Sequence, residues 1–585
     1  MRLTWSIGPP AEELRGPWNA LVLRMEQPQV FYTWEWASAF ARVCGKRMQP
    51  WIATAYEQEE LVGVVALARI SISEAAFLSG TTADYCDFVS APETRRQFVG
   101  LVLEALRADG IRTLVLANLP ADSGTAAEIA ASHAYRSFVR TGYLCAQVRL
   151  GDDEERRTLA KSLSKKKMLR RSINALGRLG PVALRHNTGS EPLGDSLEIF
   201  FLTHVARFLA TGRISNLVSA ERRGFLRELA DLLAPQGWFD LSSLCAGNQV
   251  VASNYGFRFH GSWFWYQPTF VNELEGHSPG YCLLAKLVEA AAADPAVHVV
   301  DLGLGAEGYK ERFANSQRKT LHATLAADTG TVWRARWRHG SAEKLKRFGP
   351  VEGLARLAQR FLHEGQRHIE QSGWRSALVA GGRRVQRSVT RAEEVLLFRW
   401  PAGGEESAGQ ADLHPISWTM LARTAIQHAE DRESLDYLLR SAVRLQSAQN
   451  QGVALLDAMG AVEHCAWVAP YQGFSMRELG ILLQAPNERS VLIIDCWTPP
   501  ALRGRSLYAR AIRSLAMKLS RDGQDVWIFS AATNGPSLAG IRKAGFQLHA
   551  TLRRRKVLWW SNLTRYDEEA HEPDKPGAVS GPTVR

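Results

Sequence analysis

One order of elements, strand, strand, strand, helix, strand, recurs three times along the chain, and this recurrence constrains its fold most. Strands that alternate with amphipathic helices are typical of α/β or α+β modules rather than of all-helical or all-β proteins. The sequence therefore predicts an α/β (α+β) protein with three modules. The predicted elements of the three runs, the helix being fourth in each, are 49–56, 61–70, 85–89, 92–106 and 112–117; 238–245, 249–258, 262–268, 279–291 and 297–302; and 453–457, 461–468, 490–497, 506–519 and 525–530.

Length and composition agree with several folded modules. At roughly 100 to 200 residues per domain, a chain of 585 residues predicts three to five domains. Hydrophobic residues make up 46% of the chain, which is enough to form several buried cores. The opening residues lack the apolar stretch of a signal peptide, and the chain has no run of about 18 apolar residues, the length of a membrane-spanning helix. We therefore expect a cytoplasmic protein without a transmembrane segment.

The cysteines argue against disulfides and against a metal site. The chain has seven of them, an odd number, far apart in sequence and without a C-x-x-C pair. This pattern fits a reducing compartment. The motifs H-E-x-x-H, G-x-x-x-x-G-K-[ST] and G-x-S-x-G are also absent, which removes the main support for metalloprotease, P-loop and α/β-hydrolase functions. We expect no bound metal.

The net charge of +12 is concentrated between two modules. Residues 331–400 contain 15 Lys and Arg against 6 Asp and Glu, and apolar residues recur there at helical spacing. We interpret 331–412 as a basic helical connector with a flexible linker at its end. Two interpretations stay open. This segment is either a solvated connector or a docking surface. The docking partner would be the anionic inner surface of the membrane, an acidic polysaccharide or a polysaccharide-synthesis protein.

The remaining boundaries follow from this connector. The predicted modules are 1–150, 151–330 and 413–567, and the first two are in tandem. Residues 568–585 show no apolar periodicity, so we expect a disordered tail there.

The third module carries the most specific motif. Its third predicted strand ends at Trp497, next to Thr498, and after two prolines the turn Arg503-Gly504-Arg505-Ser506-Leu507 opens a helix. Consecutive backbone N–H groups at a helix start form an anion site, to which the helix dipole and the two arginines add positive charge. A pyrophosphate group is the expected ligand.

This pattern resembles the GNAT superfamily of acyl-CoA N-acyltransferases. Members carry an R/Q-x-x-G-x-G/A turn at the same place and a downstream N-x-x-S/A motif that leads to Gly-Phe, matched here by Asn534, Ser537 and Gly545-Phe546. The resemblance implies binding of acetyl-CoA or another acyl-CoA. The cofactor-binding residues that it implies in this module are Trp497, Thr498, Arg503, Gly504, Arg505, Ser506, Leu507, Asn534 and Ser537.

The third module departs from the family pattern at three positions. Ser506 and Tyr508 stand where the family has small residues, usually glycine, and Ile541 stands where members often have a tyrosine that protonates the leaving thiolate. Either another residue supplies that proton, or the module has kept the fold and lost the reaction.

Residues 20–325 resemble a second family, the CelD-like acetyltransferases associated with cellulose and exopolysaccharide biosynthesis, which are related to FemA/FemB-type aminoacyltransferases. Together the two resemblances imply three GNAT-like modules with mixed central sheets flanked by helices. The segments that carry the second resemblance, in chain order, are 31–36, 83–87, 162–171, 251–256, 265–267, 278–280, 301–303 and 309–310.

The second module offers its own candidate site residues. Ser278 and Gly280 occupy the strand-to-helix position and are predicted to bind the donor there. Asp301 is a candidate general base, because an amine acceptor with a pKa near ~10 must lose a proton before it attacks a thioester. Tyr309 is a candidate proton donor to the thiolate, and Lys310 is a candidate ligand of a phosphate or acyl carbonyl.

The sequence thus predicts an N-acyltransferase that acts by direct attack of an acceptor amine on an acyl-CoA thioester. The family association implies an amino sugar or amino-acid-like acceptor in exopolysaccharide or envelope assembly. Two alternatives stay open. One is tRNA-dependent aminoacyl transfer, in which the basic cluster at 161–171 contacts phosphates. The other is a non-catalytic scaffold for polysaccharide synthesis.

Overall fold

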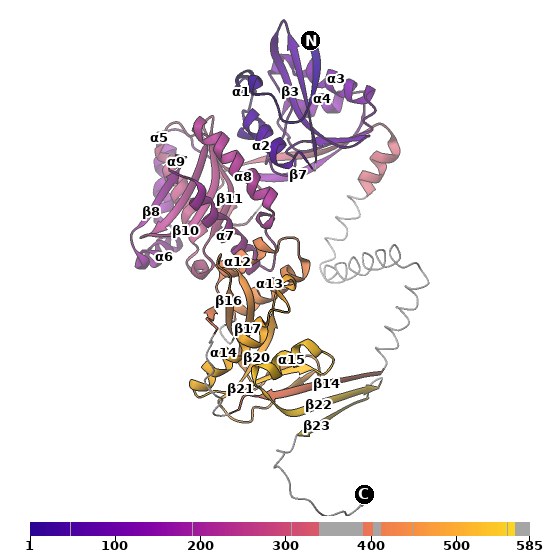
Figure 1. The fold of residues 1–585 in the computed structure, drawn as a ribbon. Helices are drawn as coiled ribbons and strands as arrows, with labels where there is room; N and C mark the ends of the chain where they lie inside the picture. The colour runs from indigo at the N-terminus through magenta and orange to yellow at the C-terminus, as the bar shows by residue number, and fades with distance from the viewer. Residues whose placement is uncertain are drawn as a thin grey trace, which may run out of the picture. The chain divides into compact units, whose positions relative to one another are not determined.

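A computed structural model of the chain describes residues 1–46, 48–189, 191–305, 307–337, 390–401, 411–447, 450–557 and 560–567, and divides into two compact units, 1–352 and 353–585 (Figure 1). In both units helices flank a mixed sheet, which confirms the predicted α/β (α+β) class. Most of the predicted connector (331–412) and the whole predicted tail (568–585) lie outside the described residues. Residues 390–399, which fall within the predicted connector, form a strand.

The N-terminal unit is built on a single large sheet of thirteen strands. Its strands are β1 (Arg2–Ile7), β2 (Gln49–Glu57), β3 (Glu60–Ser71), β4 (Glu74–Phe77), β5 (Val89–Ser90), β6 (Thr113–Pro120), β7 (Arg136–Arg149), β8 (Val182–Asn187), β9 (Phe239–Ala246), β10 (Gln249–Phe259), β11 (Ser262–Phe270), β12 (Val299–Leu304) and β13 (Ser316–Ala326). Its helices are α1 (Arg15–Leu23), α2 (Trp34–Cys44), α3 (Pro92–Ala108), α4 (Gly124–Ala131), α5 (Asp153–Lys165), α6 (Lys167–Leu176), α7 (Gly194–Ala210), α8 (Ala220–Leu233) and α9 (Pro279–Ala293).

Two strands are exchanged between the halves of this unit. The first half has a parallel pair, β4 and β6, and the second half has a parallel pair, β11 and β12. The last strand of the second half, β13, pairs with β6, and the last strand of the first half, β7, pairs with β12. Because β7 and β13 also pair with each other, the two halves share one continuous sheet.

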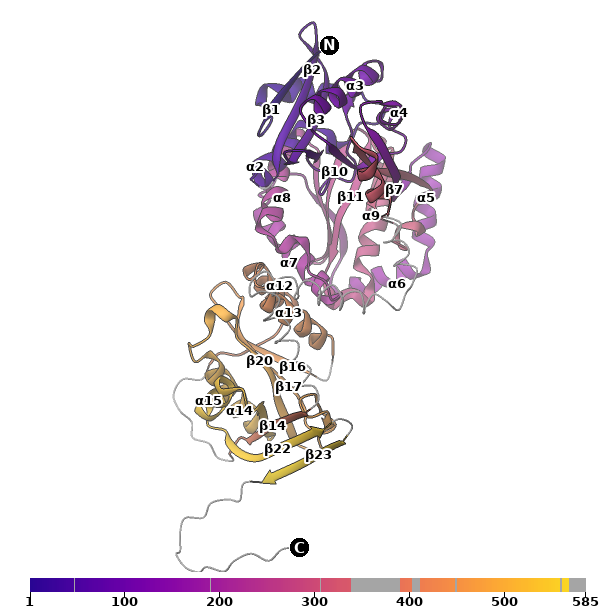
Figure 2. The ribbon, with the colours of Figure 1, turned by 90° about the vertical axis from the view of Figure 1, so that its right-hand side faces the viewer.

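Helices cover both faces of the second half of the sheet. Figure 2 shows α5, α6 and α9 beside one face and α7 and α8 beside the other. Leu283, Leu284 and Leu287 of α9 are fully buried against Trp263 and Trp265 of β11. Burial of this much apolar surface is the main force that holds α9 to the sheet.

The first run of elements differs from the sequence prediction at one strand. Residues 85–89 were predicted as its third strand, but that strand is β4, and residues 78–88 form a buried loop. The loop is fixed by hydrogen bonds to Asn118, whose main-chain carbonyl accepts from Cys86 N and whose side chain donates to Ala83 O. Tyr85 and Phe88 are buried in this loop. The apolar pattern that predicted a strand therefore reflects burial of the loop and not pairing in the sheet.

The C-terminal unit has an eight-stranded sheet and a separate two-stranded ribbon. Its strands are β14 (Thr390–Arg399), β15 (His414–Pro415), β16 (Gln451–Leu456), β17 (Val462–Pro470), β18 (Ser475–Met476), β19 (Ile481–Leu482), β20 (Ser490–Trp497), β21 (Asp525–Ala531), β22 (Gln547–Val557) and β23 (Trp560–Asp567). Its helices are α12 (Trp418–Gln427), α13 (Arg432–Leu445), α14 (Leu507–Arg521) and α15 (Gly535–Ala544).

The position of β14 sets the architecture of this unit. It lies between β21 and β22 and is antiparallel to both, so β21 has β20 on one side and β14 on the other. Helices α14 and α15 pack on one face of the sheet through Ile512, Leu515 and Ile541. On the other face Tyr437 of α13 packs on Trp497 of β20.

Among the described residues, no helix is both long enough and apolar enough to cross a bilayer. All seven cysteines are free thiols, as the sequence predicts.

Candidate active site

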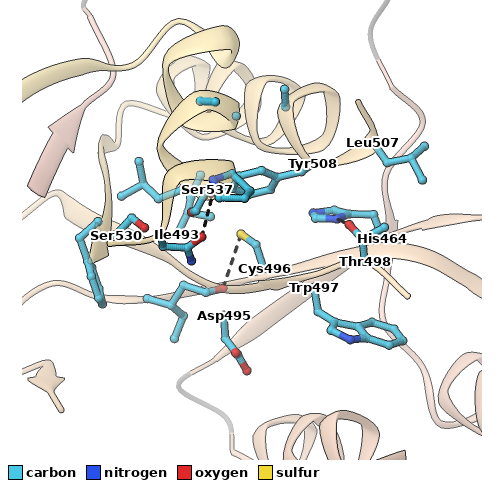
Figure 3. A pocket seen from close by; sticks show the side chains of 18 of the residues that line it. His464, Ile493, Asp495, Cys496, Trp497, Thr498, Leu507, Tyr508, Ser530 and Ser537 are labelled. Atoms are coloured by element: carbon cyan, nitrogen blue, oxygen red, sulfur yellow. Dashed lines mark hydrogen bonds between the residues drawn. The ribbon is translucent and has the colours of Figure 1, made fainter. Parts of the chain in front are cut away.

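The candidate site of the C-terminal unit forms where two parallel strands separate. Pairing between β20 and β21 runs from Ser490 and Asp525 to Ile493 and Ile528 and then stops. Beyond that point β21 continues to pair with β14, and β20 continues to pair with β17. The two strand ends therefore diverge, and they line a cavity of about 1080 Å³ (Figure 3).

The cavity brings together all nine residues that the sequence assigned to the donor in this module. They come from the end of β20, from the turn before α14 that follows it, and from the start of α15, which is more distant in sequence. These residues are Trp497, Thr498, Arg503, Gly504, Arg505, Ser506, Leu507, Asn534 and Ser537.

The start of α14 offers unpaired donors to this cavity. Ser506 is its N-cap residue and has a left-handed backbone with φ 59°, and its side chain makes no capping hydrogen bond. The first N–H groups of a helix have no partner within the helix and carry partial positive charge. The Nζ atom of Lys543 donates to Ser506 Oγ at 2.9 Å and brings a cation to the same end.

The two arginines of the turn have different environments. Arg503 forms an ion pair with Glu433 and also donates from Nε to Thr498 O at 3.3 Å. Arg505 is exposed and lines the cavity. Arg505 and Lys543 are therefore the cations best placed to meet an anion at this helix start.

The large Tyr508 side chain is accommodated by a small residue on the neighbouring helix. Its ring lies against Gly540 of α15, where an added Cβ atom would be only 2.4 Å from the ring. Its hydroxyl lies 3.2 Å from Ser537 Oγ, and Figure 3 labels both residues. Burial, and then the thiol of Cys496, raise the pKa of Tyr508. Ile541 is fully buried in the core and carries no hydroxyl, whereas Tyr508 lines the cavity.

Strand β20 has a bulge at the centre of the cavity. Ile494 faces Trp467 and Trp497 faces Cys465, so Asp495 and Cys496 together oppose one residue of β17. Asp495 has φ 43°, and its carbonyl accepts from Tyr437 Oη at 2.8 Å. A strained backbone at a cavity wall is typical of functional sites.

A charged pair lies on the α13 side of the bulge. The carboxylate of Asp495 is 2.5 Å from Arg444 Nη1, and both side chains are partly buried. Sequence reasoning missed this pair because the two residues are distant in the chain and match no motif. Further residues that line the cavity and were missed are Asn450, His464, Phe474, Arg477, Glu478, Cys496, Ser530 and Lys543.

His464 is a buried neutral imidazole in the cavity wall. Its side chain is 1% exposed, its Nδ1 atom is 2.8 Å from Thr498 Oγ1, and its Nε2 atom has no hydrogen-bond partner. Burial lowers the pKa of His464 to about 3. The ring is therefore uncharged at neutral pH.

The structure places the second module's candidate residues in the N-terminal unit. Ser278 is the N-cap residue of α9 with φ 50°, the same left-handed conformation as Ser506 before α14. Gly280, in the first turn of α9, faces the ring of Phe270, which lies 3.3 Å from an added Cβ. The helix start thus has the predicted geometry, but an aromatic ring closes its approach at Gly280.

The other three candidates of that module have partners within the protein. Asp301 is 2% exposed and accepts hydrogen bonds from Tyr85 Oη at 2.9 Å and Gln147 Nε2 at 2.8 Å. The hydroxyl of Tyr309 accepts from the Nε1 atom of Trp265 at 3.1 Å, and burial raises its pKa. Lys310 is buried and donates to Leu304 O at 3.0 Å.

The structure also bears on metal binding. Among the described residues no three His, Cys, Asp or Glu side chains are grouped as metal ligands would be.

Comparison with protein families identifies one segment. Residues 164–311 match the acetyltransferase (GNAT) domain. The matched segment begins in α5 and ends in the 3₁₀ helix Lys310–Arg312, within the second half of the N-terminal unit. No curated protein matches the sequence.

Several solved structures are similar to the chain. FemX is 9% identical and covers 56% of this chain and 99% of its own, with a TM-score of 0.39. A tandem GNAT protein from the clavulanic acid biosynthesis pathway is 16% identical and covers 56% of this chain and 100% of its own, with a TM-score of 0.33. A conserved protein of unknown function from Bacteroides thetaiotaomicron VPI-5482 is 11% identical and covers 55% of this chain and 100% of its own, with a TM-score of 0.38.

Proposed function

We propose that the protein is an acyl-CoA-dependent N-acyltransferase whose donor site is the cavity of the C-terminal unit. One observation carries this proposal. The nine residues that sequence motifs assign to the donor line one cavity. This cavity extends from the free N–H groups at the start of α14 to the gap between the parallel strands β20 and β21. This shape suits a long ligand with a phosphate at one end and a reactive group at the other.

Different parts of the cavity bind different parts of the acyl-CoA. The N–H groups at the start of α14, with Arg505 and Lys543, bind the pyrophosphate. The gap between β20 and β21 holds the arm that leads to the thioester. The bulge at Asp495 then lies next to the reacting carbon, where binding and orientation of both substrates supply much of the rate.

Two side chains transfer the protons of the reaction. As the acceptor nitrogen forms its bond to the acyl carbon and the bond from that carbon to sulfur breaks, Asp495 takes a proton from the nitrogen and Tyr508 gives one to the sulfur. The pKa of Tyr508 is raised by burial, so its hydroxyl carries a proton at neutral pH. Arg444 holds the carboxylate of Asp495 at the bulge.

The acceptor is an amino sugar or an amino-acid-like amine, and the reaction belongs to exopolysaccharide or envelope assembly in the cytoplasm. This part of the proposal is supported by the CelD-like sequence pattern of residues 20–325. Under this proposal the N-terminal unit, which contains the segment matched by the GNAT family model, serves the same pathway. Its candidate site residues are Asp301, Tyr309 and Lys310.

The first experiment is calorimetric titration of acetyl-CoA into the full chain. Arg505→Ala combined with Lys543→Ala removes two charge-assisted contacts of about 1.5–3 kcal/mol each, so we expect affinity to fall at least about tenfold. Lys161→Ala combined with Lys165→Ala removes the same charge from an exposed helix of the N-terminal unit and serves as the control.

Each other outcome points to a different function. Binding that survives the Arg505 and Lys543 changes but is lost in Gly280→Phe would move the donor site to the N-terminal unit. Absence of any acyl-CoA binding would contradict the proposal. Strongly salt-dependent tRNA binding would then favour aminoacyl transfer, and its absence would favour a scaffold.

A further inference from the structure

The two halves of the N-terminal unit meet at a buried polar junction. The loop 78–88 of the first half contacts the second half through two hydrogen bonds. Tyr266 Oη donates to Thr82 O, and Tyr85 Oη donates to Asp301 Oδ2 at 2.9 Å. Asp84 lies between the two loop residues that make these contacts, and so at the junction itself.

Asp84 approaches β12 very closely. An added Cβ atom at Gly303, where φ is 69°, would lie 2.6 Å from Asp84 Oδ2. Only glycine leaves room for this carboxylate and tolerates the left-handed backbone. Asp301, two residues before Gly303, is buried, whereas Asp84 is partly exposed.

Arg222 brings unpaired donors to the same junction. Its Nη2 atom donates to Tyr266 Oη at 2.8 Å, which connects it to the loop of Asp84. Its Nε and Nη1 atoms are buried and have no hydrogen-bond partner within the protein. A buried guanidinium donor without a partner is costly, because it has lost water and gained nothing in return.

Charged side chains of neighbouring elements lie near Asp84 and change its pKa. Burial, and then the negative charge of Asp301 of β12, raise the pKa of Asp84 to about 7, while Lys310 and Arg222 oppose the rise. Burial contributes the largest part of this shift. A second carboxylate and two cations therefore lie near the Asp84 carboxyl group.

We propose that Asp84 and Arg222 form a binding site for a small molecule that carries a primary amine next to a carbonyl or carboxylate oxygen. The ammonium group pairs with the Asp84 carboxylate, and the oxygen accepts hydrogen bonds from Arg222 Nε and Nη1. This ligand matches both features of the junction, because it stabilises the ionised form of Asp84 and pairs the free donors of Arg222. The site is separate from the donor cavity and does not depend on the proposed function.

Saturation-transfer NMR on the full chain tests this proposal with three small probes that each carry a methyl group. Alaninamide has both the amine and the carbonyl, isobutyramide lacks the amine, and isopropylamine lacks the carbonyl. We expect transfer to the methyl group of alaninamide and none, or far less, to the other two. Equal transfer to all three probes, or none to alaninamide, would overturn the proposal.

Variants locate the signal. We expect Asp84→Asn and Arg222→Gln each to abolish transfer to alaninamide, and the exposed Asp153→Asn to leave it unchanged. Thermal unfolding of each variant confirms that it is folded, and two different variants guard against a folding defect in one. The Arg505 and Lys543 changes should leave transfer intact, so failure of the acyl-CoA site and failure of this site are told apart. Transfer that persists in both Asp84→Asn and Arg222→Gln would show that alaninamide binds elsewhere and would overturn the proposal.

Discussion

A Cβ atom on Gly540 would lie 2.4 Å from the Cδ1 atom of Tyr508, so the tyrosine ring occupies the space that a side chain at position 540 would need. The two residues belong to neighbouring helices, α15 and α14. This contact explains how a large aromatic residue fits at the start of α14, where small residues are typical of the family pattern. It also fixes the direction of the Tyr508 hydroxyl toward Ser537.

The substitution Gly540→Ala should therefore destabilise the C-terminal unit. Overpacking typically costs about 1–3 kcal/mol, and the better helix propensity of alanine returns about 1 kcal/mol. We expect a net loss of stability and weaker acyl-CoA binding, because the Tyr508 ring must move. Calorimetric unfolding of the full chain, with and without acetyl-CoA, measures both.

The same helix offers a control for this substitution. Gly535 of α15 has no heavy atom within 4 Å of an added Cβ, so Gly535→Ala should cost no stability. Adding Tyr508→Leu to Gly540→Ala should recover part of the loss. Equal stability of Gly540→Ala and the unchanged chain would contradict the packing argument.

Ser506 and Ser278 give a matched pair of predictions. Both are N-cap residues with left-handed backbones, φ 59° and φ 50°, and neither side chain caps its helix. A non-glycine residue in this conformation costs roughly 1 kcal/mol. We expect Ser506→Gly and Ser278→Gly to raise stability by up to about 1 kcal/mol, and the β-branched Ser506→Val and Ser278→Val to lower it, as measured by chemical denaturation. Destabilisation by both glycine variants would show that these side chains contribute to folding.

The local part of the C-terminal site could be predicted from the sequence. The turn at Arg503 to Leu507 and the start of α15 at Asn534 are short motifs, and their chemistry depends on neighbours in the chain. The strand ends that complete the cavity also follow from the order of elements, because parallel strands separated by a helix end at the same edge of a sheet.

The long-range part could not be predicted. Arg444 of α13 meets Asp495 of β20, and Asp84 meets Gly303 across the junction of two halves, in each case without a motif. The exchange of β7 and β13 was equally invisible, because the apolar pattern of a strand shows which face it buries but not which strand it pairs with. The strand predicted at 85–89 failed for a related reason, since a buried loop and a buried strand have similar composition.

The pH dependence of stability tests the environment of Asp84. Its pKa is about 7 in the folded chain, against 3.8 ordinarily. Between these values the folded chain holds a proton that the unfolded chain has released, so this group makes the free energy of unfolding fall as pH rises toward 7. The loss is at most about 1.4 kcal/mol per pH unit and stops above pH 7.

The variant Asp84→Asn has no such proton. Relative to the unchanged chain it should gain stability steadily from about pH 4 to about pH 7 and show a constant difference above that. Asp153→Asn, at an exposed position, should show no such trend. Chemical denaturation of the N-terminal unit at several pH values measures the difference, and a difference that does not change with pH would refute the assignment of a raised pKa.

Two buried histidines predict acid sensitivity, one in each unit. Burial lowers the pKa of His464 and of His204 to about 3, and each ring is hydrogen-bonded through Nδ1, to Thr498 and to Ser215 respectively. In the unfolded chain both titrate near 6.5. The unfolded state therefore binds more protons below that pH, and stability is lost as pH falls from about 6.5.

Replacing each histidine by asparagine keeps a hydrogen-bonding group near the Nδ1 position and removes the titration. His464→Asn and His204→Asn should both lower stability at pH 7.5, because a smaller side chain leaves a cavity. Each should also flatten the acid slope of its own unit by up to about 1.4 kcal/mol per pH unit. The exposed His133→Asn is the control and should leave both slopes unchanged. The slope separates the two effects, because lost packing shifts stability equally at every pH, whereas loss of a buried neutral imidazole changes how stability depends on pH.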